Sequence, residues 1–285
     1  MRTVILFFLA VGLATALLAQ THSDTRTYFI ATDDLNSFRL HNVKGDVNVR
    51  GVDGQQATLT VTRRLRSASR TRLESAKEDL TLDSMRLDGS LYFFVNAPDR
   101  FFKIDPDGKG QYESDWNDRS SRDRFEVEYA FEIELLVPKQ LELWVSNHHS
   151  DLMIDNIQGD LYARNHHEDL AATNLGGNAK IINHHGDIEV SFTRNPDGEC
   201  HFKTHHGTIR IAYQDDLDAD VSLSSHHGEF FTAFDWQSVP VSASVDASQR
   251  GTRYVIKDRV VVRIGNGGPS HDFKTWHGDI YLTRN

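Results

Sequence analysis

Residues 163–170 read Ala-Arg-Asn-His-His-Glu-Asp-Leu, and residues 181–188 read Ile-Ile-Asn-His-His-Gly-Asp-Ile, so one pattern returns after 18 residues. The same pair occurs at 148–149, 205–206 and 226–227, and Trp276-His277 stands in the same context. Successive pairs are 18, 18, 21 and 21 residues apart, and 50 residues separate the last His-His pair from Trp276. Repeats of about this length are typical of solenoids, in which each unit buries its apolar face against the next.

Each pair lies in one frame of residue types. A small polar residue precedes the pair; a glycine follows it in four copies, and then come, in most copies, an acid and a large apolar residue. The small polar residues are Asn147, Asn165, Asn183, Thr204, Ser225 and Thr275, and the glycines are Gly186, Gly207, Gly228 and Gly278. Apolar residues alternate with polar ones on both sides of the pair, which indicates strands.

This frame predicts an all-β fold in which residues 139–285 form a β-solenoid of parallel, β-helix-like coils of 18–21 residues. Equivalent residues of stacked coils then lie about 4.8 Å apart, and the four glycine turns form one line. The 50-residue gap before Trp276 holds either one unmarked coil or an inserted hairpin that includes residues 253–264.

The chain before the repeat is also rich in strand patterns. Residues 125–137 alternate apolar residues with glutamates, which predicts a long strand with one wet face. Residues 70–80 have helical spacing, and residues 96–124 are rich in Asp, Arg, Ser and Gly. We therefore predict that residues 20–138 form a β-rich region that is continuous with the solenoid and carries an exposed loop at 96–124.

Residues 1–19 combine a basic start, an apolar run and small residues at its end, the signature of a signal peptide. The apolar stretch from Val4 to Ala19 has 16 residues, fewer than the roughly 20 that a spanning helix needs. We expect cleavage after Ala19, a secreted, periplasmic or cell-envelope location, and no membrane span in the mature chain. An uncleaved anchor is the alternative.

The charge and the cysteine content limit the partners. The full chain carries a net charge of −10, which becomes −11 when Arg2 leaves with the signal peptide. An acidic chain is a poor ligand for nucleic acid, so we expect an unknown surface or envelope partner instead. The single cysteine, Cys200, has no intramolecular disulfide partner and is expected to point inward.

Two segments resemble a known family. The stretch from Tyr129 to Ile154 and the tail from Gly265 to Leu282, which contains Gly278-Asp279-Ile280, are similar to the bacterial putative-adhesin family of exported β-strand-repeat proteins. The resemblance lies mainly in residues 129–285. It implies a β-solenoid at or outside the cell envelope and an adhesive role, and it supplies no catalytic residues. The His-His pairs depart from the family pattern, so their role does not follow from the resemblance.

The histidines are the candidate site. Counting in twos from Val145 or Ile181 places the second His of each pair inward and the first outward. The pairs form either a structural turn ladder or a row of Zn or Cu sites, because neutral imidazole suits these metals. The candidate ligands are His148, His149, His166, His167, His184, His185, His205, His206, His226, His227 and His277. Stacked imidazoles repel each other when protonated, so we expect their pKa values to lie below about 6.5.

No convincing catalytic motif occurs. Residues 105–110 begin like a calcium loop, but Lys109 and Trp116 stand where further oxygen ligands are needed. Ser150 lies between His149 and Asp151, and three consecutive residues do not fold back into a proton relay. The sequence therefore predicts an exported structural or adhesive module without catalysis or cofactor. Divalent transition-metal binding by the His columns is the second hypothesis, and a carbohydrate-active β-helix is the third.

Overall fold

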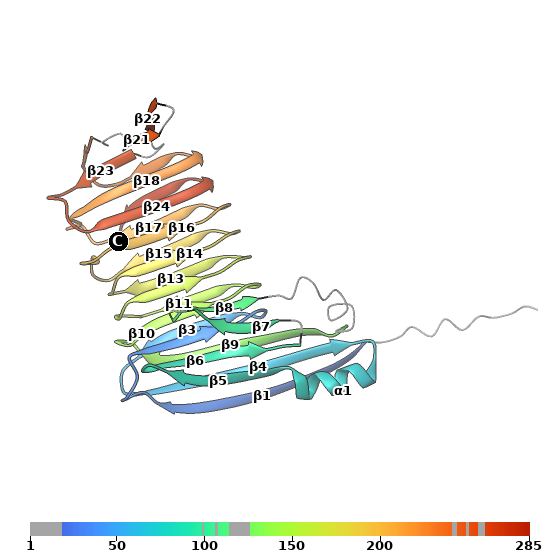
Figure 1. The fold of residues 1–285 in the computed structure, drawn as a ribbon. Coiled ribbons are helices and arrows are strands. Elements are labelled where there is room, and N and C mark those ends of the chain that lie inside the picture. Colours follow the sequence, from blue (N-terminus) through green and yellow to red (C-terminus); the bar gives the residue numbers. More distant parts are fainter. Residues whose placement is uncertain are drawn as a thin grey trace, which may run out of the picture.

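The computed structural model of the protein describes residues 19–98, 100–105, 108–113, 126–240, 244–248, 251–255 and 260–285. The described chain is mostly β, with one short helix, and most strands belong to two large sheets (Figure 1). This agrees with the predicted fold class. The interior of both sheets is parallel, and antiparallel strands occur toward the ends.

The ten-stranded sheet has the order β1 (Gln20–Ala31), β4 (Gln56–Ser67), β9 (Glu128–Pro138), β3 (Val47–Val52), β11 (Leu152–Asp155), β13 (Leu170–Leu175), β15 (Ile188–Phe192), β17 (Ile209–Tyr213), β25 (Ile280–Arg284) and β19 (Phe230–Thr232). The eleven-stranded sheet has the order β20 (Trp236–Ser238), β23 (Val260–Ile264), β18 (Ala219–His227), β24 (Ser270–His277), β16 (Cys200–Lys203), β14 (Ala179–Ile182), β12 (Leu161–Arg164), β10 (Glu142–Ser146), β2 (Ser37–His41), β6 (Ser90–Asn96) and β5 (Thr81–Leu87). Two hairpins, β7 (Phe101–Ile104) with β8 (Gly110–Glu113) and β21 (Ser244–Ser248) with β22 (Gly251–Val255), form separate two-stranded sheets.

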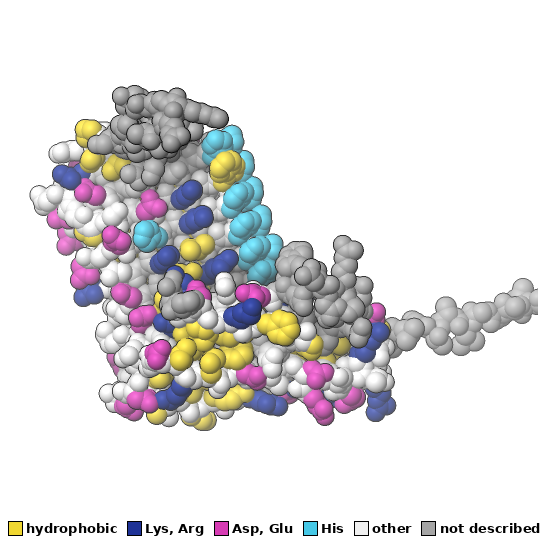
Figure 2. All heavy atoms as spheres, viewed as in Figure 1, with side chains coloured by type: hydrophobic (Ala, Val, Ile, Leu, Met, Phe, Trp, Pro, Cys, Tyr) yellow, Lys and Arg dark blue, Asp and Glu magenta, His cyan; other side chains and the backbone are white. Residues whose placement is uncertain are grey.

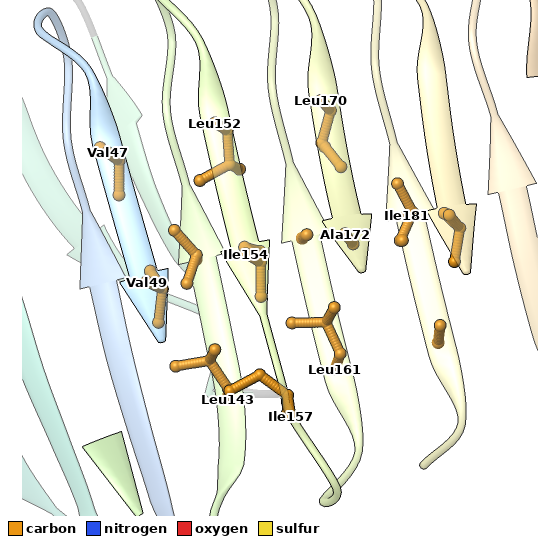
Figure 3. Close-up of a cluster of buried hydrophobic side chains, with 14 of the residues drawn as sticks. Val47, Val49, Leu143, Leu152, Ile154, Ile157, Leu161, Leu170, Ala172 and Ile181 are labelled. Carbon is orange, nitrogen blue, oxygen red and sulfur yellow. The ribbon is translucent and has the colours of Figure 1, made fainter. Parts of the chain in front are cut away.

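Each His-marked repeat supplies one strand to each sheet. The strand before the His pair joins the eleven-stranded sheet, and the strand after it joins the ten-stranded sheet. Alternate side chains of both strands point into the space between the sheets, where Val47, Leu152 and Leu170 face the interior from one sheet and Leu143 and Leu161 from the other (Figure 3). Cys200 is buried in this core, as expected from its place in the alternation. Burial raises the pKa of its thiol to about 12.

The order of the coils departs from chain order at the C-terminal end. Strand β24 lies between β16 and β18, and β25 lies between β17 and β19. The last coil of the sequence is therefore inserted between two coils that are consecutive in the chain. Residues 260–264, part of the 50-residue gap, form β23, which pairs antiparallel with β18. Of the two alternatives for this gap, the structure favours the inserted hairpin over another parallel coil.

The N-terminal region joins the same sheets. Strands β2 and β3 pair in parallel with β10 and β11, so both sheets continue past the first His-marked coil. The predicted helix is confirmed as α1 (Arg70–Asp79), which begins at the N-cap Ser69 and buries Leu73 and Ala76. The long strand predicted at 125–137 is β9.

The segment 96–124 differs from the exposed loop predicted for it. Its described part contains the β7–β8 hairpin, which packs back onto the eleven-stranded sheet. Phe102 stacks on Phe94 with ring centroids 4.4 Å apart, and the Tyr112 hydroxyl donates to the His41 carbonyl over 2.9 Å. These apolar and tyrosine contacts hold the hairpin down, and composition alone does not reveal them. Residues 114–125 lie outside the described residues.

The segment 105–110, which resembles a calcium loop, connects β7 to β8, and its described residues are Asp105, Gly108, Lys109 and Gly110. The Asp105 carboxylate accepts the Lys109 backbone N–H over 2.7 Å, so it serves the turn between β7 and β8. The signal peptide predicted for residues 1–19 lies, except for Ala19, outside the described residues. In the part of the chain that is described, no helix has both the length and the apolar character needed to cross a bilayer.

Candidate functional site

The His pairs line up along one edge of the molecule, where the chain turns from the eleven-stranded into the ten-stranded sheet (Figure 2). We call this double row the histidine ladder. Its first column contains, in spatial order, His148, His166, His184, His205, Trp276 and His226, and its second column contains His149, His167, His185, His206, His277 and His227. Neighbouring ring centroids are 4.3–6.0 Å apart in the first column and 4.8–5.4 Å apart in the second.

Buried polar side chains hold the turns that present the ladder. Asn165 is 1% exposed; its Oδ1 accepts the His166 N–H over 3.0 Å, and its Nδ2 donates to the Ser150 carbonyl of the preceding coil over 3.1 Å. Asn147 and Asn183 make equivalent bonds. In the later coils, the hydroxyls of Thr204 and Thr275 donate to the glycine carbonyl of the adjacent turn. One small polar side chain per coil thus links each turn to its neighbour.

The expectation that the second His of each pair points inward is wrong. In the first four His-His coils the strand ends directly before the buried Asn or Thr, so strand alternation stops there. Strands β18 and β24 continue through His227 and His277, and both residues of these two pairs are exposed. Both rings then lie outside the core; for example, His149 is exposed and His148 is half-buried. The ladder is therefore a surface feature, and its two columns lie side by side, with the rings of each pair 4.4–4.6 Å apart in the five His-His coils.

The acid that follows the pair has a structural role. Asp169 Oδ1 accepts the N–H of Asp187 over 2.8 Å, and Asp187 Oδ1 accepts the N–H of Thr208 over 2.8 Å. Asp151 and Asp279 do the same for Asp169 and Glu229. Each of these carboxylates therefore bonds the backbone of the next coil in space. These hydrogen bonds explain why an acid recurs at this position of the repeat, and the explanation requires no metal ion.

The residue directly after the pair adopts positive φ in the first five turns of the stack: Ser150, Glu168, Gly186, Gly207 and Gly278. The turns are close enough that a Cβ built on Gly207 would lie 2.1 Å from the Gly186 carbonyl oxygen, and one on Gly278 would lie 2.1 Å from that of Gly207. One on Gly228 would lie 1.9 Å from the Gly278 oxygen. The prediction that these glycine turns form one line is confirmed, with Gly278 between Gly207 and Gly228.

Sequence reasoning missed one coil of this stack. Residues 42–47 read Asn-Val-Lys-Gly-Asp-Val, the frame of residues 183–188 without its histidines. Asn42 is buried and donates to the Gly45 carbonyl, Gly45 has a φ of +111°, and Lys44 pairs with His149 as an isolated bridge. The spacing between Asn42 and Gly45-Asp46 is the sequence signal of this coil, and the absence of a His-His pair conceals it. Lys44 thus occupies the end of the second column.

Burial and the repulsion of neighbouring rings lower the pKa of several histidines in the ladder. Desolvation, followed by the neighbouring His149, His166 and His167, lowers the pKa of His148 to about 3. Desolvation and neighbouring histidines likewise lower the pKa of His166 to about 4. The pKa values of His149, His184, His206 and His277 are also lowered, chiefly by desolvation. The Nδ1 atoms of His148, His166 and His205 are buried and have no hydrogen-bond partner among the described residues.

These shifts predict that the protein loses stability as the pH falls below about 6.5. Above this pH, His148 and His166 are neutral in the folded and in the unfolded chain. Below it, these residues bind protons in the unfolded chain, whereas in the folded chain they bind them only near pH 3 to 4. Lowering the pH therefore favours the unfolded state. The buried His41, whose pKa is lowered to about 3, adds to the loss. At about 1.4 kcal/mol per pKa unit, we expect His41 alone to cost about 2 kcal/mol between pH 6.5 and 5.

Urea unfolding at pH 7.0, 6.0 and 5.0 measures this loss, in a range where most carboxylates do not yet titrate. His41→Leu should flatten this pH dependence, because it removes one histidine whose pKa is lowered in the folded state. A stability that is constant or rises between pH 7 and 5 would contradict the prediction.

Three candidate ligands come together at the N-terminal end of the ladder. His148, His149 and His167 each place one ring nitrogen so that the three nitrogens lie within 4.8 Å of one another. The other eight candidate histidines form no such group of three within the described part of the chain. The sequence predicted equivalent sites in every coil, whereas the ring spacing singles out this one.

A cleft of about 360 Å³ adjoins this end of the ladder, between the β7–β8 hairpin and β10. Ser146 Oγ lies 2.8 Å from His41 Nδ1 there, a pairing that resembles part of a hydrolase triad. Burial lowers the pKa of His41 to about 3, which makes it a weak base, and its Nε2 has no carboxylate partner among the described residues. We therefore assign this pair to the packing of the hairpin.

No family model and no curated protein matches the chain. Solved structures similar to it include a putative cell adhesion protein from Clostridium sporogenes, with 6% identity, coverage of 93% of this chain and 100% of that one, and a TM-score of 0.46. A putative adhesin from Bacteroides fragilis has 9% identity, coverage of 92% and 97%, and a TM-score of 0.29. Each similarity extends over more than nine-tenths of this chain.

Proposed function

We propose that this chain is an exported β-solenoid that acts as a structural and adhesive module at the cell envelope, without catalysis. Two features support the solenoid: one strand per repeat in each sheet, and turns of successive coils that stack in one line. The signal-like residues 1–19 support export. The core holds these coils in fixed register, so the molecule presents a rigid and repetitive outer surface.

The observation that carries the adhesive role is the histidine ladder itself. Every His-marked coil places two half-buried or exposed rings at the same corner, at about the spacing of the strands. A neutral imidazole has one nitrogen that donates and one that accepts a hydrogen bond, so the accessible ring nitrogens repeat a hydrogen-bonding group from coil to coil. Weak contacts repeated on one rigid support add up to tight attachment when the partner is repetitive too, as a polysaccharide or a second solenoid is.

We expect beads coated with residues 20–285 to attach under flow to at least one repetitive surface among cellulose, mucin and a layer of the same chain. Replacing His184, His205, Trp276 and His226 by Ser removes most of the exposed first column and should reduce attachment at least tenfold. The control replaces His22 and His201, which lie outside the ladder, by Ser and should attach normally. Equal attachment by both variants would remove the ladder as the adhesive surface, and failure of the unaltered chain on every surface would overturn the adhesive role.

A further inference from the structure

Beyond the adhesive role, we propose that His148, His149 and His167 form a binding site for one divalent transition-metal ion of the Zn, Cu or Ni class. One ring nitrogen from each residue lies within 4.8 Å of the other two. Three imidazoles leave a fourth coordination position open for water or for a donor from a partner. Imidazole nitrogen selects these metals over Ca²⁺ and Mg²⁺, which prefer oxygen ligands.

The three rings do not form a single stack. His149 lies parallel to His167, with centroids 4.8 Å apart at 7°, whereas His148 stands across both, at 65° to His149 and 72° to His167. Zn–N bonds of about 2.0–2.1 Å put tetrahedral ligand nitrogens about 3.3 Å apart, so the nitrogens must approach each other by about 1.5 Å at most. Side-chain rotation supplies this movement, because His149 is exposed and the other two are half-buried.

The backbone under the site is fixed. His148 and His149 share one turn, and His167 lies on the next, where its N–H donates to the His148 carbonyl over 3.0 Å. The buried Asn147 and Asn165 hold these two turns through hydrogen bonds to their own and the preceding coil. A rigid support of this kind reduces the entropy that metal binding must otherwise overcome.

His148 also has an unpaired polar atom. Its Nδ1 is buried and has no hydrogen-bond partner in the described part of the chain, which is a costly arrangement for a ring nitrogen. A metal at this ring, with the rotation that binding entails, offers a partner that the protein itself does not provide. His166 and His205 share the unpaired Nδ1, but their neighbouring rings are farther apart, for example 5.4 Å between His167 and His185.

A cation next to the site gives the proposal a further consequence. Lys44 is exposed and its backbone pairs with that of His149 as an isolated bridge, so it brings a positive charge to the coil next to the site. Like charges repel, so Lys44→Ala should tighten metal binding.

The test titrates residues 20–285 with Zn²⁺ and Cu²⁺ by calorimetry, with Ca²⁺ as the negative control. We expect one tight site, at least tenfold weaker binding in His149→Ala and in His167→Ala, and tighter binding in Lys44→Ala. The matched controls His226→Ala and His227→Ala, at the far end of the ladder, should bind like the unaltered chain. The far-UV spectrum and melting temperature without metal should stay unchanged in all five variants, because these side chains lie outside the core.

The visible absorption spectrum of bound Co²⁺ is a second test, because this absorption is strong in four-coordinate sites and weak in octahedral sites. An intense spectrum that His167→Ala abolishes and His227→Ala retains supports the site. Three results would overturn it: no binding of Zn²⁺ or Cu²⁺ at micromolar concentration, a stoichiometry of several equivalent ions spread along the ladder, or equal weakening by the near and the far variants.

Discussion

Gly207→Ala is expected to lower the free energy of unfolding by about 4 kcal/mol, because two costs add. Gly207 has a φ of +139°, a conformation that an alanine adopts only with strain. In addition, the new Cβ would lie 2.1 Å from the Gly186 carbonyl oxygen, and that oxygen belongs to the backbone of the adjacent coil. The clash is relieved only if two coils move apart, which lengthens the hydrogen bonds on both sides of the turn.

Gly54→Ala is the matched control, since it separates the strain from the clash. Gly54 has a φ of +113°, but a Cβ there meets no atom within 4 Å. We expect a loss of about 1 kcal/mol in this variant. Urea unfolding of both variants and of the unaltered chain measures the difference. Equal losses would mean that the turns are not as closely stacked as the structure places them.

Phe273→Ala is expected to lower the free energy of unfolding by about 4 kcal/mol, because replacing a buried Phe by Ala leaves a cavity in the core. Phe273 is 0% exposed and stacks on Phe202 with ring centroids 5.0 Å apart. It lies in β24, the inserted strand, whose Lys274 carbonyl accepts the Thr204 N–H over 3.0 Å. Loosening this strand should therefore also expose amides of β16 to exchange, although β16 is 70 residues earlier in the chain.

Hydrogen exchange followed by mass spectrometry checks this prediction. Peptides that cover residues 200–213 and 219–232 should both lose protection in Phe273→Ala, because the inserted coil lies between them. Phe38→Ala is the control: Phe38 is equally buried and stacks on Phe93, but it lies near the other end of the stack. That variant should leave both peptides protected. If the coils followed chain order instead, residues 200–213 would stay protected in Phe273→Ala.

The turn chemistry of each coil was readable in the sequence because it is local. A buried Asn or Thr needs its backbone partners within a few residues or on the adjacent coil, and a residue at positive φ favours glycine. These requirements recur in most coils, so the repeat predicted the line of turns, the inward residues Val145 and Ile181, and the buried Cys200. The same frame at 42–47 was equally readable once the histidines were ignored.

Only the tertiary structure decided the order of the coils, the facing of the histidines and the place of the three-His cluster. Coils that share this pattern of residue types can pair with several neighbours. The sequence therefore does not specify the two strands between which β24 lies. Strand parity predicted an inward ring, but the turn held by Asn147 or Asn165 interrupts the parity at the histidines. The distances among His148, His149 and His167 depend on how far each coil is offset from the next. That offset is set by packing over the whole stack, so no local spacing in the sequence encodes it.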